Sequence, residues 1–199
     1  MGVYFHVITT SFPMGAIRAI DRTYPHHDHT GTLVHRRLDR GVESDWGPPG
    51  EGTGIREDVH HVVQRVCNVV QPHSLDVLRI CAHGSSNASQ PAILLGNGLT
   101  DSSVHAFEAI RPLWRIVYQP EQLRRHQRGA LNYHAVIPRV ELHVCNAALR
   151  QEAPLQALAN AVQAPVFASY TVQRIHDPHN FVIQGALVRK EPVLQTAYR

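Results

Sequence analysis

The sequence predicts an α/β sandwich with a mainly parallel central sheet. Apolar, β-rich segments alternate with amphipathic helical segments along the chain, as crossover connections between parallel strands require. One of these segments, 75–84, is rich in apolar residues, which is typical of a strand buried on both faces, and 140–148 indicates another strand that runs into a turn. The 199 residues, of which 43% are hydrophobic, suffice for one domain with its own core. We therefore expect a single domain over residues 1–199.

The first part of the chain predicts one strand, one irregular region and one helix. Residues 3–9 (VYFHVIT) are apolar and β-rich and indicate the first buried strand. Residues 10–54 contain many turn formers, including the run GPPGEGTG, and indicate loops and short elements. Valines at helical spacing over 55–70 predict an amphipathic helix, with Thr53 as its N-cap and Pro72 beyond its end.

Further strands are expected in the second part of the chain. Their apolar cores lie at residues 75–84, 92–95, 140–148 and 165–169. A terminal hairpin is expected from 181–183 and 186–188, with its turn at Gln184 and Gly185.

Two helices are expected between these strands. The first begins near Thr100 or Asp101, and its apolar face consists of Val104, Phe107, Ile110 and Trp114. The second has an apolar face formed by Leu155, Leu158, Ala159 and Val162. Residues 115–139 are arginine-rich and contain two prolines, so we interpret them as an insertion or connecting loop.

Composition and charge argue against a membrane or nucleic-acid partner. No apolar run approaches the roughly 18 residues of a membrane span, and no basic flank precedes an apolar start. We expect a cytoplasmic protein, either resident or delivered as an effector. The densest basic stretch contains Arg111, Arg115, Arg124, Arg125 and Arg128. Because no known reader motif accompanies these arginines, we interpret the stretch as a solvated loop.

Three cysteines, Cys67, Cys81 and Cys145, cannot all pair with one another, and they lack the CxxC spacing of a zinc site. We expect free thiols, with Cys67 and Cys81 in structural roles. Cys145 differs because it ends a predicted strand, as His83 does. In open α/β sheets ligands bind beyond the carboxyl ends of the strands.

Neighbouring parallel strands would bring His83 and Cys145 to one edge of the sheet. An imidazole and a thiol in that position can serve as general base and nucleophile. Gly84 has no side chain, so its amide could join that of Cys145 around an oxyanion. The alternative is structural, since a cysteine at a strand end is usually a small buried hydrophobe.

Four blocks, LRICAHG, AILLGNGLT, ELHVCNAA and LANAVQAPVFAS, occur in this order over about residues 75–169. Together they resemble the caspase-like superfamily of cysteine peptidases, and most closely its bacterial CHAT-like domains. The resemblance implies a caspase-like three-layer α/β/α sandwich. It implies His83 as general base, Cys145 as nucleophile, and the Gly84 and Cys145 amides as oxyanion donors.

The resemblance also implies a polypeptide substrate and no cofactor. In such folds strand-end loops build the specificity pocket, which here would involve Thr9, Ser11, Ser169 and Tyr170. The pentapeptide that surrounds the caspase nucleophile is absent, so a preference for aspartate is not carried over. A catalytically inactive relative that binds a protein partner stays open as an alternative.

A second alternative is a metal-dependent hydrolase. The 15 histidines of the chain include a loop, YPHHDHTG, that resembles the metal loop of metallo-β-lactamase-type hydrolases. His26, Asp28 and His29 could bind zinc there and leave a position open for water. The competing interpretation is a polar, histidine-rich loop with adventitious metal affinity.

Overall fold

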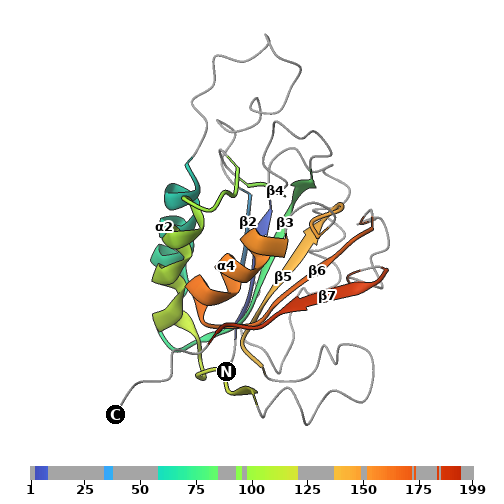
Figure 1. Cartoon of the computed structure of the whole chain (residues 1–199). Coiled ribbons are helices and arrows are strands. Elements are labelled where there is room, and N and C mark those ends of the chain that lie inside the picture. Colours follow the sequence, from blue (N-terminus) through green and yellow to red (C-terminus); the bar gives the residue numbers. More distant parts are fainter. Residues whose placement is uncertain are drawn as a thin grey trace, which may run out of the picture.

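The computed structural model describes residues 3–8, 34–37, 58–84, 93–95, 98–120, 137–148, 152–171, 173, 183 and 185–193. Over these ranges the chain forms an open, mostly parallel seven-stranded sheet with helices packed against it (Figure 1). The α/β class predicted from the sequence is therefore confirmed. In the described ranges no helix is long and apolar enough to cross a membrane.

The sheet has the strand order β2-β1-β3-β5-β6-β7, with β4 paired to β3 outside this path. The strands are β1 (Val3–Ile8), β2 (Val34–Arg37), β3 (Leu75–Gly84), β4 (Ile93–Leu94), β5 (Arg139–Val144), β6 (Val166–Ser169) and β7 (Leu187–Lys190). From β2 to β6 neighbouring strands are parallel, whereas β4 and β7 are antiparallel to their partners. The long strand β3 is therefore central, and residues 75–82 are buried throughout.

Two features of the sheet were not predicted from the sequence. Strand β2 lies in the region expected to be irregular, because its four residues, VHRR, carry no apolar pattern. Strand β7 pairs with β6, with Ser169 opposite Leu187, and the hairpin expected between 181–183 and 186–188 stays a prediction. Residues 181 and 182 lie outside the described part of the chain.

Helices α2 (Val59–Val69), η2 (Val104–Leu113) and α4 (Glu152–Val162) lie together on one face of the sheet (Figure 1). Their buried residues join one alternating set of strand residues in the main core. On β3 this set is Leu78, Ile80 and Ala82, and on β5 it is Val140, Leu142 and Val144. A second helical layer on the opposite face, which a three-layer sandwich requires, is not among the described residues.

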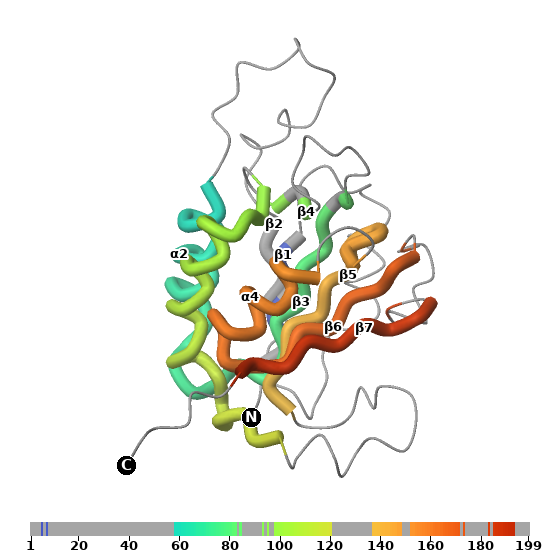
Figure 2. Tube along the Cα trace, viewed as in Figure 1, coloured from blue at the N-terminus to red at the C-terminus, as the bar shows by residue number. Residues whose placement is uncertain are grey.

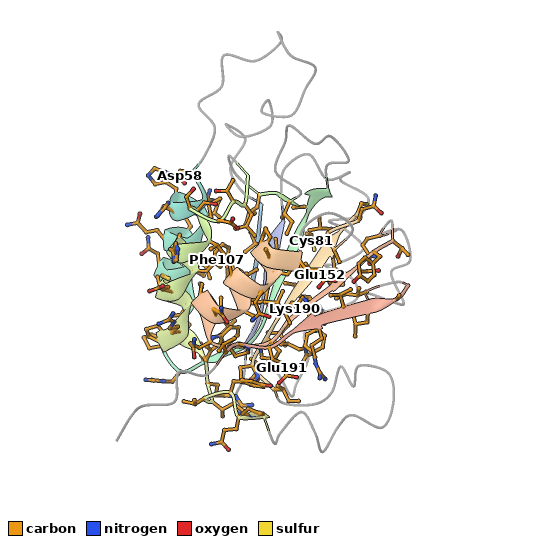
Figure 3. All side chains as sticks on the ribbon, viewed as in Figure 1. Asp58, Cys81, Phe107, Glu152, Lys190 and Glu191 are labelled. Atoms are coloured by element: carbon orange, nitrogen blue, oxygen red, sulfur yellow. The ribbon has the colours of Figure 1, made fainter. Side chains whose placement is uncertain are left out.

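Helix η2 is a 3-10 helix, although its sequence suggests an ordinary amphipathic helix. Its buried residues recur at every third position, which matches the three residues per turn of a 3-10 helix: Val104, Phe107, Ile110 and Leu113. Phe107 lies within the helical layer in Figure 3. Trp114 follows the helix, and its indole N–H donates to the carbonyl of Val162 at 2.8 Å. The hydrogen bond anchors η2 to the end of α4.

Two arginines of the basic stretch stabilise the fold. The Nε of Arg111 donates to the carbonyl of Ala161 at 2.6 Å, near the end of α4. Arg115 forms an ion pair with Asp76, with 2.7 Å between Nε and Oδ1. The guanidinium groups of Arg111 and Arg115 thus have partners within the fold, whereas 121–136 lies outside the described residues.

The N-cap of α2 is Asp58, so the prediction of Thr53 is wrong. The Asp58 carboxylate accepts a hydrogen bond from the amide of His60 at 3.1 Å. Hydrogen bonds from His60 hold the pKa of Asp58 below its ordinary value. A cap oxygen of this kind satisfies an amide that has no partner within the helix.

Replacing Asp58 by Ala is expected to lower the free energy of unfolding by about 1 kcal/mol, because the cap is lost. Asn retains the cap oxygen, so Asp58→Asn is expected to stay within a few tenths of a kcal/mol of the wild type. Urea unfolding followed by circular dichroism measures both variants. Equal losses in the two would show that the cap hydrogen bond is not the source of the effect.

Candidate active site

The carboxyl ends of β3 and β5 lie side by side (Figure 2). The two strands are parallel neighbours, with Cys81 opposite His143 and Ala82 opposite Val144. Gly84 is the last residue of β3, and Cys145 is the first residue after β5. The prediction that these two strand ends share one edge of the sheet is confirmed.

Gly84 packs directly against the backbone of Cys145. A Cβ atom at Gly84 would lie 1.7 Å from the carbonyl oxygen and 2.8 Å from the carbonyl carbon of Cys145. Only a glycine permits this approach, so the two residues proposed as oxyanion donors are neighbours. The backbone of His83 pairs with Leu94 of β4, whereas its side chain lies outside what the structure describes. The His83/Cys145 dyad accordingly stays a prediction.

The sulfur of Cys145 contacts both polar atoms of the Gln173 backbone. The Gln173 amide donates to Sγ at 3.3 Å, and the thiol donates to the Gln173 carbonyl oxygen at 3.7 Å. Cys145 is half-buried, so its sulfur lies at the margin of the protein interior. Gln173 could not be predicted from the sequence, because nothing in the local sequence shows that this residue lies next to the end of β5.

The turn after Cys145 lies against the segment that follows β6. Asn146 has a left-handed backbone with φ of 55°, and its amide donates to the carbonyl of Thr171 at 3.0 Å. Two residues further on, the amide of Ala148 donates to the carbonyl of Ser169 at 3.2 Å. Asparagine tolerates the left-handed conformation better than most residues, which suits it to the position after Cys145.

Of the four residues predicted to bind substrate, Ser169 and Tyr170 are described, and Thr9 and Ser11 lie outside the described ranges. Ser169 is fully buried, and its Oγ accepts the amide hydrogen of Thr171 at 3.1 Å. Tyr170 is exposed, and its hydroxyl donates to Glu152 at 2.7 Å. Glu152 also pairs with Lys190 of β7 at 2.5 Å, and Figure 3 shows these two side chains together.

Burial acts on the thiols of the two other cysteines, fully on Cys81 and partly on Cys67. Burial raises the pKa of Cys81 to about 12, so this thiol is protonated at neutral pH. Burial also raises the pKa of Cys67, and its thiol donates to the carbonyl of Ala109 at 3.5 Å. All three cysteines are free, as expected.

A buried charged cluster lies on the sheet face opposite the helices, and sequence analysis did not identify it. Glu141 of β5 is fully buried and accepts from the Nε atoms of Arg79 and Arg139 at 2.5 and 2.6 Å. The Nε2 of His143 lies 3.6 Å from the same carboxylate. Cys145 follows His143 by two residues, so the cluster lies on the strand that leads to the candidate nucleophile.

Burial and charge act in opposite directions on the pKa of Glu141. Burial alone would raise it, but the guanidinium groups of Arg79 and Arg139, with His143, hold it well below its ordinary value. Burial lowers the pKa of His143, and the nearby Glu141 only partly offsets this effect. Glu141 is therefore ionised and His143 neutral at pH 7.

The sequence does contain a signal for this cluster. Charged or polar residues alternate with apolar ones at 79 of β3 and at 139, 141 and 143 of β5. Residues two apart on a strand share a face, so the alternation places these side chains on one side of the sheet. A search for alternation within the apolar strands would have identified the cluster.

No three histidine, cysteine, aspartate or glutamate side chains of the described residues come together as a metal site. The candidate zinc ligands His26, Asp28 and His29 lie outside these ranges. No family model matches the chain, and neither a curated protein nor a solved structure is detectably similar to it.

Proposed function

We propose that this protein is a cysteine-dependent peptidase of the caspase-like type, with His83 and Cys145 as its dyad. The observation that supports the proposal most strongly is the packing of Gly84 on Cys145 at the carboxyl edge of the sheet. This is the edge at which α/β sheets bind ligands. The packing brings Gly84, which follows the proposed base His83, next to the proposed nucleophile Cys145.

The proposed reaction proceeds through a thioester. His83 accepts the thiol proton, and the Cys145 sulfur attacks the carbonyl carbon of the scissile peptide bond. The amides of Gly84 and Cys145 donate to the oxyanion that forms. His83 then gives the proton to the leaving amine, and a water molecule hydrolyses the thioester to release the acid and regenerate the thiol.

The resemblance to caspase-like domains supports the same proposal. Its four sequence blocks fall on β3, on the segment around β4, on β5 with its turn, and on α4 with β6. In this interpretation the sheet is the centre of a three-layer sandwich. The strand-end segment around Tyr170 would contact the substrate, and Tyr170 is exposed there.

Replacing Cys145 by Ala is expected to reduce cleavage of a peptide library by at least about 10³-fold, since the nucleophile is removed. Cys67→Ala is the matched control, because it removes a half-buried thiol of α2 that donates to the carbonyl of Ala109, and it should retain cleavage. Mass spectrometry of the products, with and without a chelator, measures both variants and also reports the residue preferred before the cut.

The same experiment separates the alternatives. Cleavage by the wild type that a chelator leaves unchanged is expected. Activity that survives Cys145→Ala and disappears with chelator would overturn the proposal in favour of a metal site at His26, Asp28 and His29. A wild type that cleaves nothing but forms a stable complex with a protein partner would favour an inactive binding module.

A further inference from the structure

Ser169, Thr171 and Gln173 contact the turn after β5 in the reverse of its chain order, and Gln173 contacts the Cys145 sulfur. Three hydrogen bonds join these residues to the turn: Ala148 N to Ser169 O (3.2 Å), Asn146 N to Thr171 O (3.0 Å) and Gln173 N to Cys145 Sγ (3.3 Å). The first two are ordinary backbone pairs. In the third the direction is reversed, because the amide of Gln173 donates and the sulfur of Cys145 accepts. The position of Gln173 therefore bears on where the sulfur lies.

From this arrangement we infer that Gln173 is a positioning residue for Cys145 in the proposed peptidase reaction. The inference rests on the proposed function only for the role of the thiol as nucleophile. The backbone amide and carbonyl of Gln173 contact the sulfur. The side chain of Gln173 fixes this backbone through its hydrogen bonds to Thr171.

The two backbone contacts of the sulfur respond differently to loss of its proton. The contact with the Gln173 carbonyl, at 3.7 Å, needs the thiol hydrogen and is lost with it. The contact with the Gln173 amide, at 3.3 Å, needs only a lone pair on sulfur. A hydrogen bond to a charged acceptor is stronger than one to a neutral acceptor, so the amide contact strengthens when the thiolate forms. The amide therefore holds the sulfur in its reactive form.

The side chain of Gln173 fixes the peptide group that contacts the sulfur. Only 8% of Gln173 is exposed, and its Nε2 donates to the carbonyl oxygen of Thr171 at 3.1 Å and to Oγ1 at 3.4 Å. The Oγ1 of Thr171 also lies 3.0 Å from the Oγ of the buried Ser169. Gln173 is thus tied to a hydroxyl pair at the end of β6.

Gly185, two residues before β7, lies close to the side chain of Thr171. It has a left-handed backbone with φ of 82°, and a Cβ there would lie 2.3 Å from the Oγ1 of Thr171. Glycine is the residue that allows this backbone to approach Thr171 so closely. Gly185 therefore packs on Thr171, whose carbonyl and hydroxyl oxygens accept from the Gln173 side chain.

The test is the rate at which iodoacetamide alkylates Cys145 across a pH series, measured for each cysteine by peptide mass spectrometry. Gln173→Pro deletes the amide hydrogen at the sulfur and keeps the carbonyl, and it also removes the side-chain contacts with Thr171. Its difference from Gln173→Ala therefore isolates the amide hydrogen. We expect alkylation of Cys145 at neutral pH to fall about tenfold, with a changed pH profile, because a hydrogen bond to a charged group is lost. Cys67 in the same molecule is the internal control, and its rate is expected to stay at the wild-type value.

Gln173→Ala is the second variant, and it keeps the amide while removing the side-chain contacts with Thr171. A smaller decrease, confined to Cys145, is expected, and this variant decides the question if Gln173→Pro does not fold. A wild-type profile for Cys145 in a folded Gln173→Pro variant, or in Gln173→Ala when the proline variant is unfolded, overturns the inference.

Alkylation requires no peptide cleavage, so the inference and the proposed function can fail separately. A changed Cys145 profile in a protein that cleaves no peptide would keep the positioning role and refute the peptidase. Cleavage by Gln173→Pro at the wild-type rate and with the wild-type alkylation profile would refute the positioning role alone.

Discussion

Glu141→Gln is expected to lower the free energy of unfolding by about 3–5 kcal/mol, because it removes the anion from a buried ion-pair cluster. The Glu141 side chain is fully buried, and those of Arg79 and Arg139 are 2% exposed. Glutamine keeps the shape and one acceptor oxygen but not the charge. Two buried guanidinium groups would then lose the carboxylate that both contact. Urea unfolding at neutral pH measures the loss.

The same cluster makes the protein less stable in acid. The native pKa of Glu141 lies well below its ordinary value of 4.5, so its stabilising contribution is complete above pH 4.5 and decreases as the pH falls toward the native value. The native pKa of His143 also lies below its ordinary 6.5, so the unfolded chain binds that proton first and stability decreases below pH 6.5. Each group contributes a slope of at most about 1.4 kcal/mol per pH unit.

Glu108→Gln is the matched control for Glu141→Gln. The Glu108 side chain is 51% exposed, and it pairs with His105 and Arg111 on the surface of η2 at 3.5 and 3.6 Å. Exposed pairs contribute little, so the change is expected to stay within about 1 kcal/mol. A loss in Glu141→Gln no larger than in Glu108→Gln would contradict a buried, charge-dependent cluster.

Elements with dense apolar sequence could be predicted closely. The strand expected at 75–84 is β3 with the same bounds, and residues 165–169 contain β6. Burial on both faces gives such strands a composition that no loop shares. By contrast, β2 has four residues and gains its place by pairing with β1, a contact that its own sequence does not encode.

The shape of η2 was also beyond the sequence prediction. Spacings of three and four residues both suit an amphipathic helix, and the choice between a 3-10 and an α-helix depends on how the helix fits between α2 and α4. Pro112 within η2 removes one amide donor, which is a local signal against a regular α-helix at that end.

In the candidate site, too, the strand ends could be predicted from the sequence and the loop contact could not. That Gly84 and Cys145 share an edge follows from two buried strands in one parallel sheet, which the sequence indicates. The contacts of Cys145 with Gln173 depend on how the chain returns after β6, which tertiary packing determines. The residues that could be predicted are therefore those at strand ends, and the residue missed is the one that a loop brings to them.

Gly84→Ala is expected to have the second large effect, on both stability and the candidate site. The added Cβ would lie 1.7 Å from a backbone oxygen of Cys145, and a backbone atom cannot move aside as a flexible side chain can. We expect a loss of about 1–3 kcal/mol in the free energy of unfolding, which is usual for overpacking. Relief of the clash requires β3 and Cys145 to separate, so alkylation of Cys145 should change as well.

Ala159→Val separates the two effects of Gly84→Ala. Ala159 is fully buried in α4, so the added methyl groups should cost a comparable 1–3 kcal/mol, roughly, on the helical side of the sheet. In the Ala159→Val protein, Cys145 should nevertheless keep the wild-type alkylation rate, because residue 159 lies in α4 and not in the contact between Gly84 and Cys145. A Gly84→Ala protein that is equally destabilised but alkylates Cys145 at the wild-type rate would show that the approach of Gly84 serves folding and does not position the thiol. A change confined to Gly84→Ala would instead tie the geometry of the proposed oxyanion donors to the reactivity of the sulfur.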